Sequence, residues 1–422
     1  MTALHRLLRL AAVDIDPLRR YRDFRLLFIG QVVSILGGAV RRVAMPFQIY
    51  ALTHSSLAVG LLGLFAFVPL LLLSLLGGAL ADAGDRRRIV QWTEFGMVGL
   101  SVVLLANALL PSPALWVIYA VQVIGAGLDA LQTPSLNAML PRLVKREDLP
   151  AAGAVSELAY NMGSVAGPAL AGGSIALVGL PATYGIDSAT LTLSLLALAA
   201  MRTLPPPPEA ERPSLRRIVE GLRYARSRPD LLGTYFVDMV ALFFGMPMAL
   251  FPSIATRFGG PGVLGLLYSG PAVGEFLAVL TSGWVSRVHR HGMAIILAAG
   301  VWGIAIIGFG LAPSLPFALI CLALAGGADQ ISGIFRGAIW NQSIPDALRG
   351  RLASIELISY ASGPALGDLE AGAVATAFSV EASVVSGGIL SFAGVAALAL
   401  FLPQLRHYDN RTYLRPAKTD SA

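Results

Sequence analysis

The chain has 422 residues, of which 55% are hydrophobic and only 13% are charged. About a quarter of the residues of a soluble globular domain are charged, so this composition excludes an ordinary soluble enzyme. The 45 glycines and 26 prolines lie among apolar runs, which is typical of helical membrane proteins and not of disordered chains. Cys321 is the only cysteine, too few for an intramolecular disulfide or a thiolate metal site.

Apolar runs long enough to cross a bilayer recur along the chain, and the clearest one, 57–80, contains no charged residue. A helix needs about 20 apolar residues to cross the hydrocarbon core. The runs and their interruptions predict an all-helical membrane protein with twelve spans. The predicted spans are 24–50, 57–80, 89–110, 114–138, 151–179, 183–203, 230–256, 263–286, 293–312, 315–340, 352–378 and 383–402.

A proline-rich polar segment at 204–213 separates the first six predicted spans from the last six. Consecutive prolines favour an extended conformation. The basic amphipathic stretch that follows is expected to lie as a helix on the membrane surface. The predicted parts are a cytoplasmic segment 1–23, an N-terminal half 24–203, a linker 204–229, a C-terminal half 230–402 and a cytoplasmic tail 403–422.

Basic residues gather on one side of this predicted layout. All but four of the 31 Lys and Arg residues lie in the termini and in the loops that alternation places on the same side. Cytoplasmic loops of membrane proteins carry such an excess, so both termini are predicted to be cytoplasmic. The exceptions are Arg257 in an outer loop and Arg41, Arg42 and Arg336 within spans.

The two halves share short sequence matches at a spacing of roughly 200 residues, which indicates an internal duplication. The tetrapeptide Gly-Pro-Ala-Leu occurs at 167–170 and again at 363–366, and Asp129 and Asp329 each follow glycines in equivalent spans. Two parallel repeats in a membrane protein place a substrate path between them, near the middle of the bilayer.

The loop after the second span, 77–88, combines glycines, an aspartate and three arginines. It resembles the signature loop of the major facilitator superfamily. The resemblance implies twelve helices in two six-helix halves with pseudo-two-fold symmetry, and a cytoplasmic gate that includes Gly78, Asp82, Arg86 and Arg87. A loop that merely obeys the positive-inside rule would explain the arginines, but not the glycines or Asp82.

Gly163, Gly167 and Pro168 in the fifth span resemble the G-x-x-x-G-P antiporter signature of exporters in this superfamily. Small residues four apart permit close helix packing, which is the simpler interpretation, and proline interrupts the backbone hydrogen bonds. In the fourth span, Tyr119 occupies the position of the arginine found in drug/proton antiporters. A resemblance along most of the chain, carried by 43–48, 52–56, 281–283 and 405–407, is to the enterobactin-exporter and macrolide-efflux group of the superfamily.

Ionisable residues inside spans are rare and mark candidate functional sites. Asp129 and Asp329 are predicted to lie deep in the inner half of the membrane, and our hypothesis is that one of them carries a coupling proton. A carboxylate that only makes helix contacts is the alternative. Arg336 lies two turns after Asp329 and is expected to neutralise it.

Further charged and polar residues are candidates for cargo contact or gating. Glu157 and Glu356 are expected to begin their helices, where a carboxylate either stabilises the helix dipole or takes part in a gate. Arg41 and Arg42 are neighbours on one helix, so at most one faces a given cavity, and a position close to the outer surface is the alternative. The predicted substrate-binding residues are Gln31, Arg41, Arg42, Gln48, Asp238, Glu275 and Arg336.

An ATP-driven motor is excluded by the sequence, because neither Lys145 nor Lys418 follows the glycine that a P-loop requires. The function expected from the residues and the resemblance is proton-coupled efflux of an amphipathic small molecule, such as a siderophore or drug, by alternating access. Proton-coupled import of a nutrient and a non-transporting scaffold or sensor are the alternatives. We expect no enzymatic activity, cofactor, metal or nucleic acid, and a monomer in the bacterial inner membrane whose partners are substrate, protons and lipid.

Overall fold

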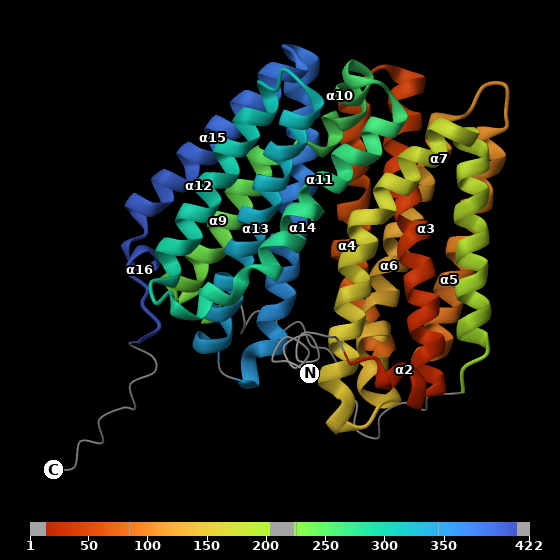
Figure 1. The fold of residues 1–422 in the computed structure, drawn as a ribbon, viewed down its shortest axis with the longest axis horizontal. Helices are drawn as coiled ribbons and strands as arrows, with labels where there is room; N and C mark the ends of the chain where they lie inside the picture. The colour runs from red at the N-terminus through yellow and green to blue at the C-terminus, as the bar shows by residue number, and fades with distance from the viewer. Residues whose placement is uncertain (1–13, 84, 203–222, 225, 345, 412–422) are drawn as a thin grey trace, which may run out of the picture. The chain divides into compact units, whose positions relative to one another are not determined.

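The computed structural model describes residues 14–83, 85–202, 223–224, 226–344 and 346–411, apart from the side chains of 74–83, 230 and 346–360. Within these residues every regular element is helical (Figure 1). The elements before the linker are α2 (Asp16–Arg20), α3 (Arg22–Thr53), α4 (Ser56–Ala83), α5 (Arg86–Ala108), α6 (Leu115–Leu143), η1 (Arg146–Asp148) and α7 (Leu149–Ala199).

The elements after the linker form the second bundle drawn in Figure 1. They are α9 (Pro229–Gly245), η2 (Met248–Leu250), α10 (Phe251–Phe258), α11 (Pro261–Leu280), η3 (Ser282–Arg287), α12 (His291–Gly310), α13 (Leu315–Ser343), α14 (Asp346–Ala377), α15 (Val380–Phe401) and α16 (Pro403–Arg406).

Twelve spans account for these helices, as the sequence predicts. Ten helical stretches of the described residues are long and apolar enough to cross a membrane. One of them contains two predicted spans, because α7 turns sharply at Gly179, whose φ of 79° is a conformation that glycine adopts without strain. The twelfth span is α14, which is 32 residues long. Large apolar side chains such as Trp92, Trp116 and Phe401 are exposed, as expected of surfaces that face lipid.

The prediction of one continuous helix at 230–256 is wrong, because the helix is interrupted at Met246 and Pro247. Proline cannot donate a backbone hydrogen bond, and it disfavours helical geometry at the residue before it. The backbone N–H of Ala249 donates instead to Asp368 Oδ1 on α14, at 2.9 Å. The predicted span at 263–286 is also too long, since α11 ends at Leu280 and η3 follows.

The chain divides into two compact units. The first, or N-terminal, unit consists of Met1–Met45 and Val68–Pro213, and the second, or C-terminal, unit consists of Pro46–Phe67 and Ser214–Ala422. The second unit therefore includes the hairpin that joins α3 to α4. Within this unit, a Cβ atom at Gly60 would lie 2.3 Å from the carbonyl oxygen of Asp368, so the hairpin packs backbone to backbone on α14.

Equivalent glycines pack equivalent helices in the two units. In the first unit, a Cβ atom at Gly167 of α7 would lie 2.5 Å from the Cβ of Ala39 on α3. In the second, a Cβ atom at Gly363 of α14 would lie 3.3 Å from the Cβ of Leu242 on α9, and one at Gly367 would lie 2.5 Å from the carbonyl oxygen of Phe243. The repeated Gly-Pro-Ala-Leu motif thus serves the same helix–helix contact in both units, which agrees with an internal duplication.

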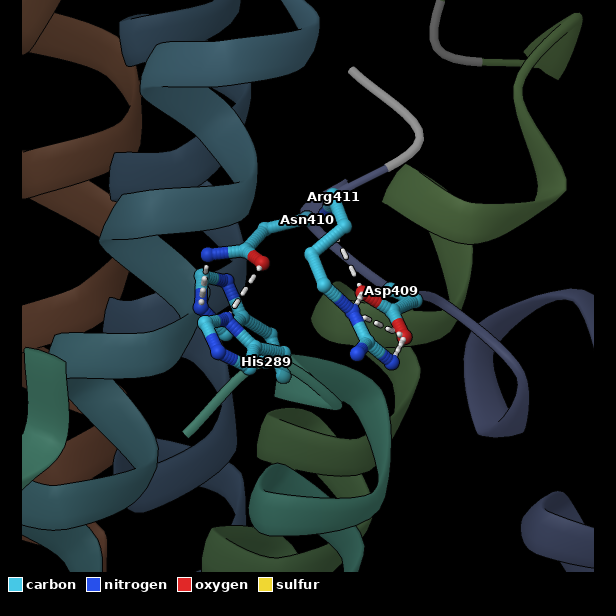
Figure 2. Close-up of polar contacts among 5 residues, drawn as sticks. His289, Asp409, Asn410 and Arg411 are labelled. Carbon is cyan, nitrogen blue, oxygen red and sulfur yellow. Dashed lines mark hydrogen bonds and ion pairs between the residues drawn. The ribbon is translucent and has the colours of Figure 1, made fainter. Parts of the chain in front are cut away.

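The segment after α15 folds back onto the second unit. Leu405 is fully buried, and Gly292 at the start of α12 leaves room for its backbone. Figure 2 shows Asn410 beside the loop before α12, where its Oδ1 lies 3.2 Å from His289 Nδ1. Asn410 Nδ2 lies 3.1 Å from His291 Nε2, and its backbone N–H donates to the carbonyl oxygen of His289. The tail at 407–411 is therefore hydrogen-bonded to the loop between α11 and α12 through Asn410.

Candidate functional site

A buried ion pair joins α3 and α7 of the N-terminal unit. Arg41 Nε on α3 lies 3.5 Å from Asp187 Oδ2 on α7, and the Asp187 side chain is fully buried. Gly37 makes room for this contact, because a Cβ atom there would lie 2.9 Å from Asp187 Oδ1. Arg41 Nη1 also reaches the sulfur of Met97 on α5, at 2.9 Å. Arg41 is therefore held in the interior of the unit and does not extend to the outer surface.

A second carboxylate, Glu94, is buried in the same unit. It lies on α5 with 2% of its surface exposed. Its Oε2 accepts a hydrogen bond of 2.8 Å from Gln132 Nε2 on α6. Sequence reasoning missed both Glu94 and Asp187, although each is an acid inside a predicted span and the rule that selected Asp129 applies equally to them.

Asp129 and Arg42 differ from this buried group because both are exposed in the described structure. Asp129 lies on α6 three residues before Gln132, on the same side of the helix, and its carbonyl oxygen accepts a hydrogen bond from Thr133. The unit thus places an accessible carboxylate one turn from the hydrogen bond that ties Gln132 to the buried Glu94.

In the C-terminal unit, Arg336 on α13 pairs with two carboxylates. Its Nη2 lies 3.4 Å from Asp329 Oδ1 on the same helix, so the predicted contact between these two residues is confirmed. Its Nη1 forms an ion pair with Asp238 on α9, a residue that is 7% exposed. Asp238 was predicted to contact cargo, but in the structure its carboxylate is paired with Arg336 of the same unit.

Asp329 also lines a small pocket inside the C-terminal unit, together with Glu275 of α11, Met246, Phe251 and Trp302. Glycines bring the two acid-bearing helices together: a Cβ atom at Gly274 of α11 would overlap the carbonyl oxygen of Ala323 on α13. The interruption after α9 contributes Met246 to the wall. The pocket therefore combines two carboxylates with apolar and aromatic side chains. Its volume of about 50 Å³ has room for one group of a larger molecule and not for a whole drug-sized one.

The predicted gate residues lie in several environments. Arg86 Nη1 donates to the carbonyl oxygen of Ala138 on α6, and Arg87 donates to the carbonyl oxygens of Leu198 and Ala199, at the end of α7. The last carbonyls of a helix lack the regular hydrogen bonds of its interior, so Arg87 caps α7. The structure does not describe the surroundings of Gly78 or the side chains of Asp82 and Glu356.

The expectation that Glu157 and Glu356 begin their helices is wrong. Helix α7 begins at Leu149 and α14 at Asp346, so both glutamates lie more than two turns inside. The electrostatic effect of a helix end is confined to its first turn, so the dipole cannot explain either residue. Glu157 is exposed on α7.

The remaining predicted residues are placed as follows. Gly163 and Gly167 both face α3, where a Cβ atom at Gly163 would lie 2.5 Å from Ile35, and Pro168 is buried beside them. Gln48 is buried at 2% exposure, and Gln31 is half-buried. Of the predicted substrate-binding and proton-coupling residues, the structure brings Asp238, Asp329 and Arg336 together in the second unit. In the first unit Arg41 pairs with Asp187, which was not predicted.

Comparison with known proteins supplies the family context. Residues 13–418 match the family model described as transmembrane secretion effector. The chain is 29% identical over 402 residues to the enterobactin exporter EntS of Escherichia coli K12, and 30% identical over 406 residues to that of Citrobacter koseri. In both cases 94% of this chain and 95% of the relative are covered.

Solved transporters share the fold at lower identity. The nucleoside transporter NupG matches with a TM-score of 0.74 and 13% identity, over 91% of this chain and 99% of that one. A bacterial homologue of the human lysosomal transporter Spinster matches with a TM-score of 0.69 and 16% identity, over 95% and 99% of the two chains. These matches establish the twelve-helix fold in two halves.

Proposed function

We propose that this chain, which belongs to the transmembrane secretion effector family, exports an amphipathic small molecule in exchange for protons. The proposed cargo is a siderophore or a drug-like compound. The protein is a multi-pass membrane transporter of the major facilitator type, and not an enzyme. The observation that carries export is the match to enterobactin exporters over 94% of the chain.

Proton coupling is supported by carboxylates that both units hold within their membrane helices. Asp129 is accessible, and Asp329 lies beside Arg336 and lines a pocket. Carboxylates of this kind are the usual proton relays of transporters. In our proposal Asp129 and Asp329 bind protons, and alternating access couples proton entry to cargo exit. The pocket at Asp329 and Glu275 is the proposed cargo contact of the C-terminal half, with Arg42, Gln31 and Gln48 as candidates in the rest of the chain.

The distribution of basic residues supports the proposed orientation. Placement in the bacterial inner membrane with cytoplasmic termini puts all but four of the 31 Lys and Arg residues on the cytoplasmic side or in the termini. The same proposal includes a monomeric state and two halves at 24–203 and 230–402. It also includes a gate made of Gly78, Asp82, Arg86, Arg87, Gly163, Gly167, Pro168, Glu157 and Glu356.

Purified protein in liposomes with a pH-sensitive dye inside would test this function. We expect protons to move only when a suitable siderophore, macrolide or cationic dye is present, and in the direction opposite to that compound. Movement in the same direction would instead establish import, and compound flux without proton flux would exclude coupling. Asp129→Asn and Asp329→Asn should weaken the coupled flux, whereas Asp16→Asn, which alters only a surface ion pair with Arg20, should not.

A further inference from the structure

The interior of the N-terminal unit holds three charged side chains that do not sum to zero. Arg41 of α3 carries one positive charge, whereas Asp187 of α7 and Glu94 of α5 are two carboxylates. Their exposed fractions are 15%, 0% and 2%. With both acids ionised, this buried triad has a net charge of −1.

The arginine of the triad is engaged by Asp187. Its Nε lies 3.5 Å from Asp187 Oδ2, which is an ion pair without a hydrogen bond, because neither Asp187 oxygen has a hydrogen-bond partner among the described residues. Asp187 therefore has a counter-charge, and Arg41 Nη1 contacts Met97, which is one turn from Glu94 on α5. Glu94 has a neutral neighbour instead: its Oε2 accepts from Gln132, while its Oε1 is buried and has no hydrogen-bond partner among the described residues.

A buried carboxylate with a neutral partner and an unpartnered oxygen is costly, because it has lost water without gaining a counter-charge. One proton on Oε1 would bring the triad to neutrality and leave the Gln132 hydrogen bond to Oε2 in place. The triad therefore has the composition of a site for a single proton.

We infer that Glu94 is a proton-binding residue of the N-terminal unit, which gains a proton at Oε1 and loses it again in each transport cycle. The inference rests on the proposed proton-coupled function. The O–H bond forms at Oε1 with a proton that hydronium supplies on one side of the membrane, and it breaks when that proton returns to water on the other side. Exposed Asp129, one turn from Gln132 on α6, is the group that passes the proton on.

Other charged and titratable groups of this unit lie on α3, α6 and α7, the helices beside α5. Arg41 and Arg42 project from α3, Asp129 from α6, and Asp187 and Tyr184 from α7. Asp129 and Arg42 are exposed, and neither forms an ion pair with Glu94 among the described residues. The buried balance is set by Arg41 and Asp187, which makes the number of protons held by the triad depend on those two residues.

The test compares two activities of reconstituted protein: transport driven by a proton gradient, and exchange of labelled for unlabelled cargo at equal pH. Glu94→Gln mimics the protonated state permanently. We expect it to retain exchange and to lose the response to the proton gradient. The exposed control Glu147→Gln in η1 should retain both activities. A Glu94→Gln protein that still follows the gradient with an unchanged proton-to-cargo ratio would overturn the inference.

Asp187→Asn gives an independent test from the same charge balance. It leaves Arg41 and Glu94 as one cation and one anion, so the triad no longer requires a proton, and gradient-driven transport should again be lost while exchange persists. Unaltered gradient dependence in this variant would contradict the inference even where Glu94→Gln does not fold. A wild-type protein that ignores the gradient would instead refute the proposed coupling itself.

Discussion

Arg41 and Asp238 are charges of opposite sign on the first long helix of each half, and each is paired inside its own unit. Arg41 of α3 pairs with Asp187, and Asp238 of α9 pairs with Arg336. The buried charge on this helix thus has the opposite sign in the two halves, although glycines of α7 and α14 pack against the helix in the same way. Substitutions at equivalent positions should consequently have different effects in the two halves.

Removal of Arg336 should cost more stability than removal of either acid beside it. Arg336→Met leaves Asp238 without its cation in the interior, and loss of one partner of a buried pair typically costs about 3–5 kcal/mol. Asp238→Asn should cost less, because Arg336 keeps Asp329. Thermal unfolding in detergent measures the order. As a control, Arg257→Gln breaks an exposed pair with Glu381 and should cost no more than about 1 kcal/mol. Equal losses for Arg336→Met and Asp238→Asn would contradict this assignment.

A methyl group at position 167 should push α7 away from α3. Gly167→Ala places a Cβ atom 2.5 Å from that of Ala39, and such overpacking typically costs about 1–3 kcal/mol. The double variant with Ala39→Gly should recover most of this loss, because it removes the other methyl group. Gly185→Ala is the control on the same helix, since a Cβ atom there meets open space. Additive losses in the double variant would show that the two methyl groups do not meet.

The tail should be insensitive to pH near neutrality and loosen in acid. Arg411 donates from Nε at 3.0 Å and Nη2 at 2.5 Å to the Asp409 carboxylate, and these bonds hold the pKa of Asp409 below its usual range. A lowered native pKa stabilises the fold above the unfolded pKa of about 3.9 and is lost as the pH falls through the native pKa. Carbon NMR of the Asp409 carboxyl checks this. Its titration midpoint should move upward in Arg411→Gln, and an unmoved midpoint would contradict the contact.

Loss of the Asn410 side chain should release the tail from the α11–α12 loop. The amide contacts His289 (Figure 2) and also His291, and a hydrogen bond of this kind contributes about 0.5–1.5 kcal/mol. Asn410→Ala should therefore accelerate hydrogen exchange at the backbone amide of residue 410, which donates to the His289 carbonyl. The exposed control His407→Ala bonds only within its own turn and should leave that exchange rate unchanged.

Patterns along the sequence were sufficient to predict the spans, since apolar runs and breakers are local properties. The turn at Gly179 separates the two spans predicted at 151–179 and 183–203. The repeated glycine motif predicted close helix packing, and the partners of Gly167 and Gly363 confirm it. The twelve-helix fold in two halves was predicted for these reasons.

Charge pairing was harder to predict, because the partner of a buried ion lies on a helix distant in sequence. Arg336 and Asp329 are seven residues apart, and their contact follows from helix geometry. Arg41 and Asp187 are brought together only by the packing of α3 on α7 at Gly37, and Glu94 is tied to Gln132 across two helices. The break after α9 was missed because Pro247 lies in an otherwise apolar run, and proline alone does not distinguish a kink from an interruption.

That break gives the seventh span a joint. Rotation about Met246 and Pro247 breaks no backbone hydrogen bond of a helix, whereas bending elsewhere in the span would break one. Two side chains from other helices hold the joint: Asp368 of α14 accepts from Ala249, and the Tyr268 hydroxyl of α11 donates to the carbonyl oxygen of Met248. The angle between α9 and α10 is therefore determined by the neighbours of this span, and a displacement of α11 or α14 acts directly on α10.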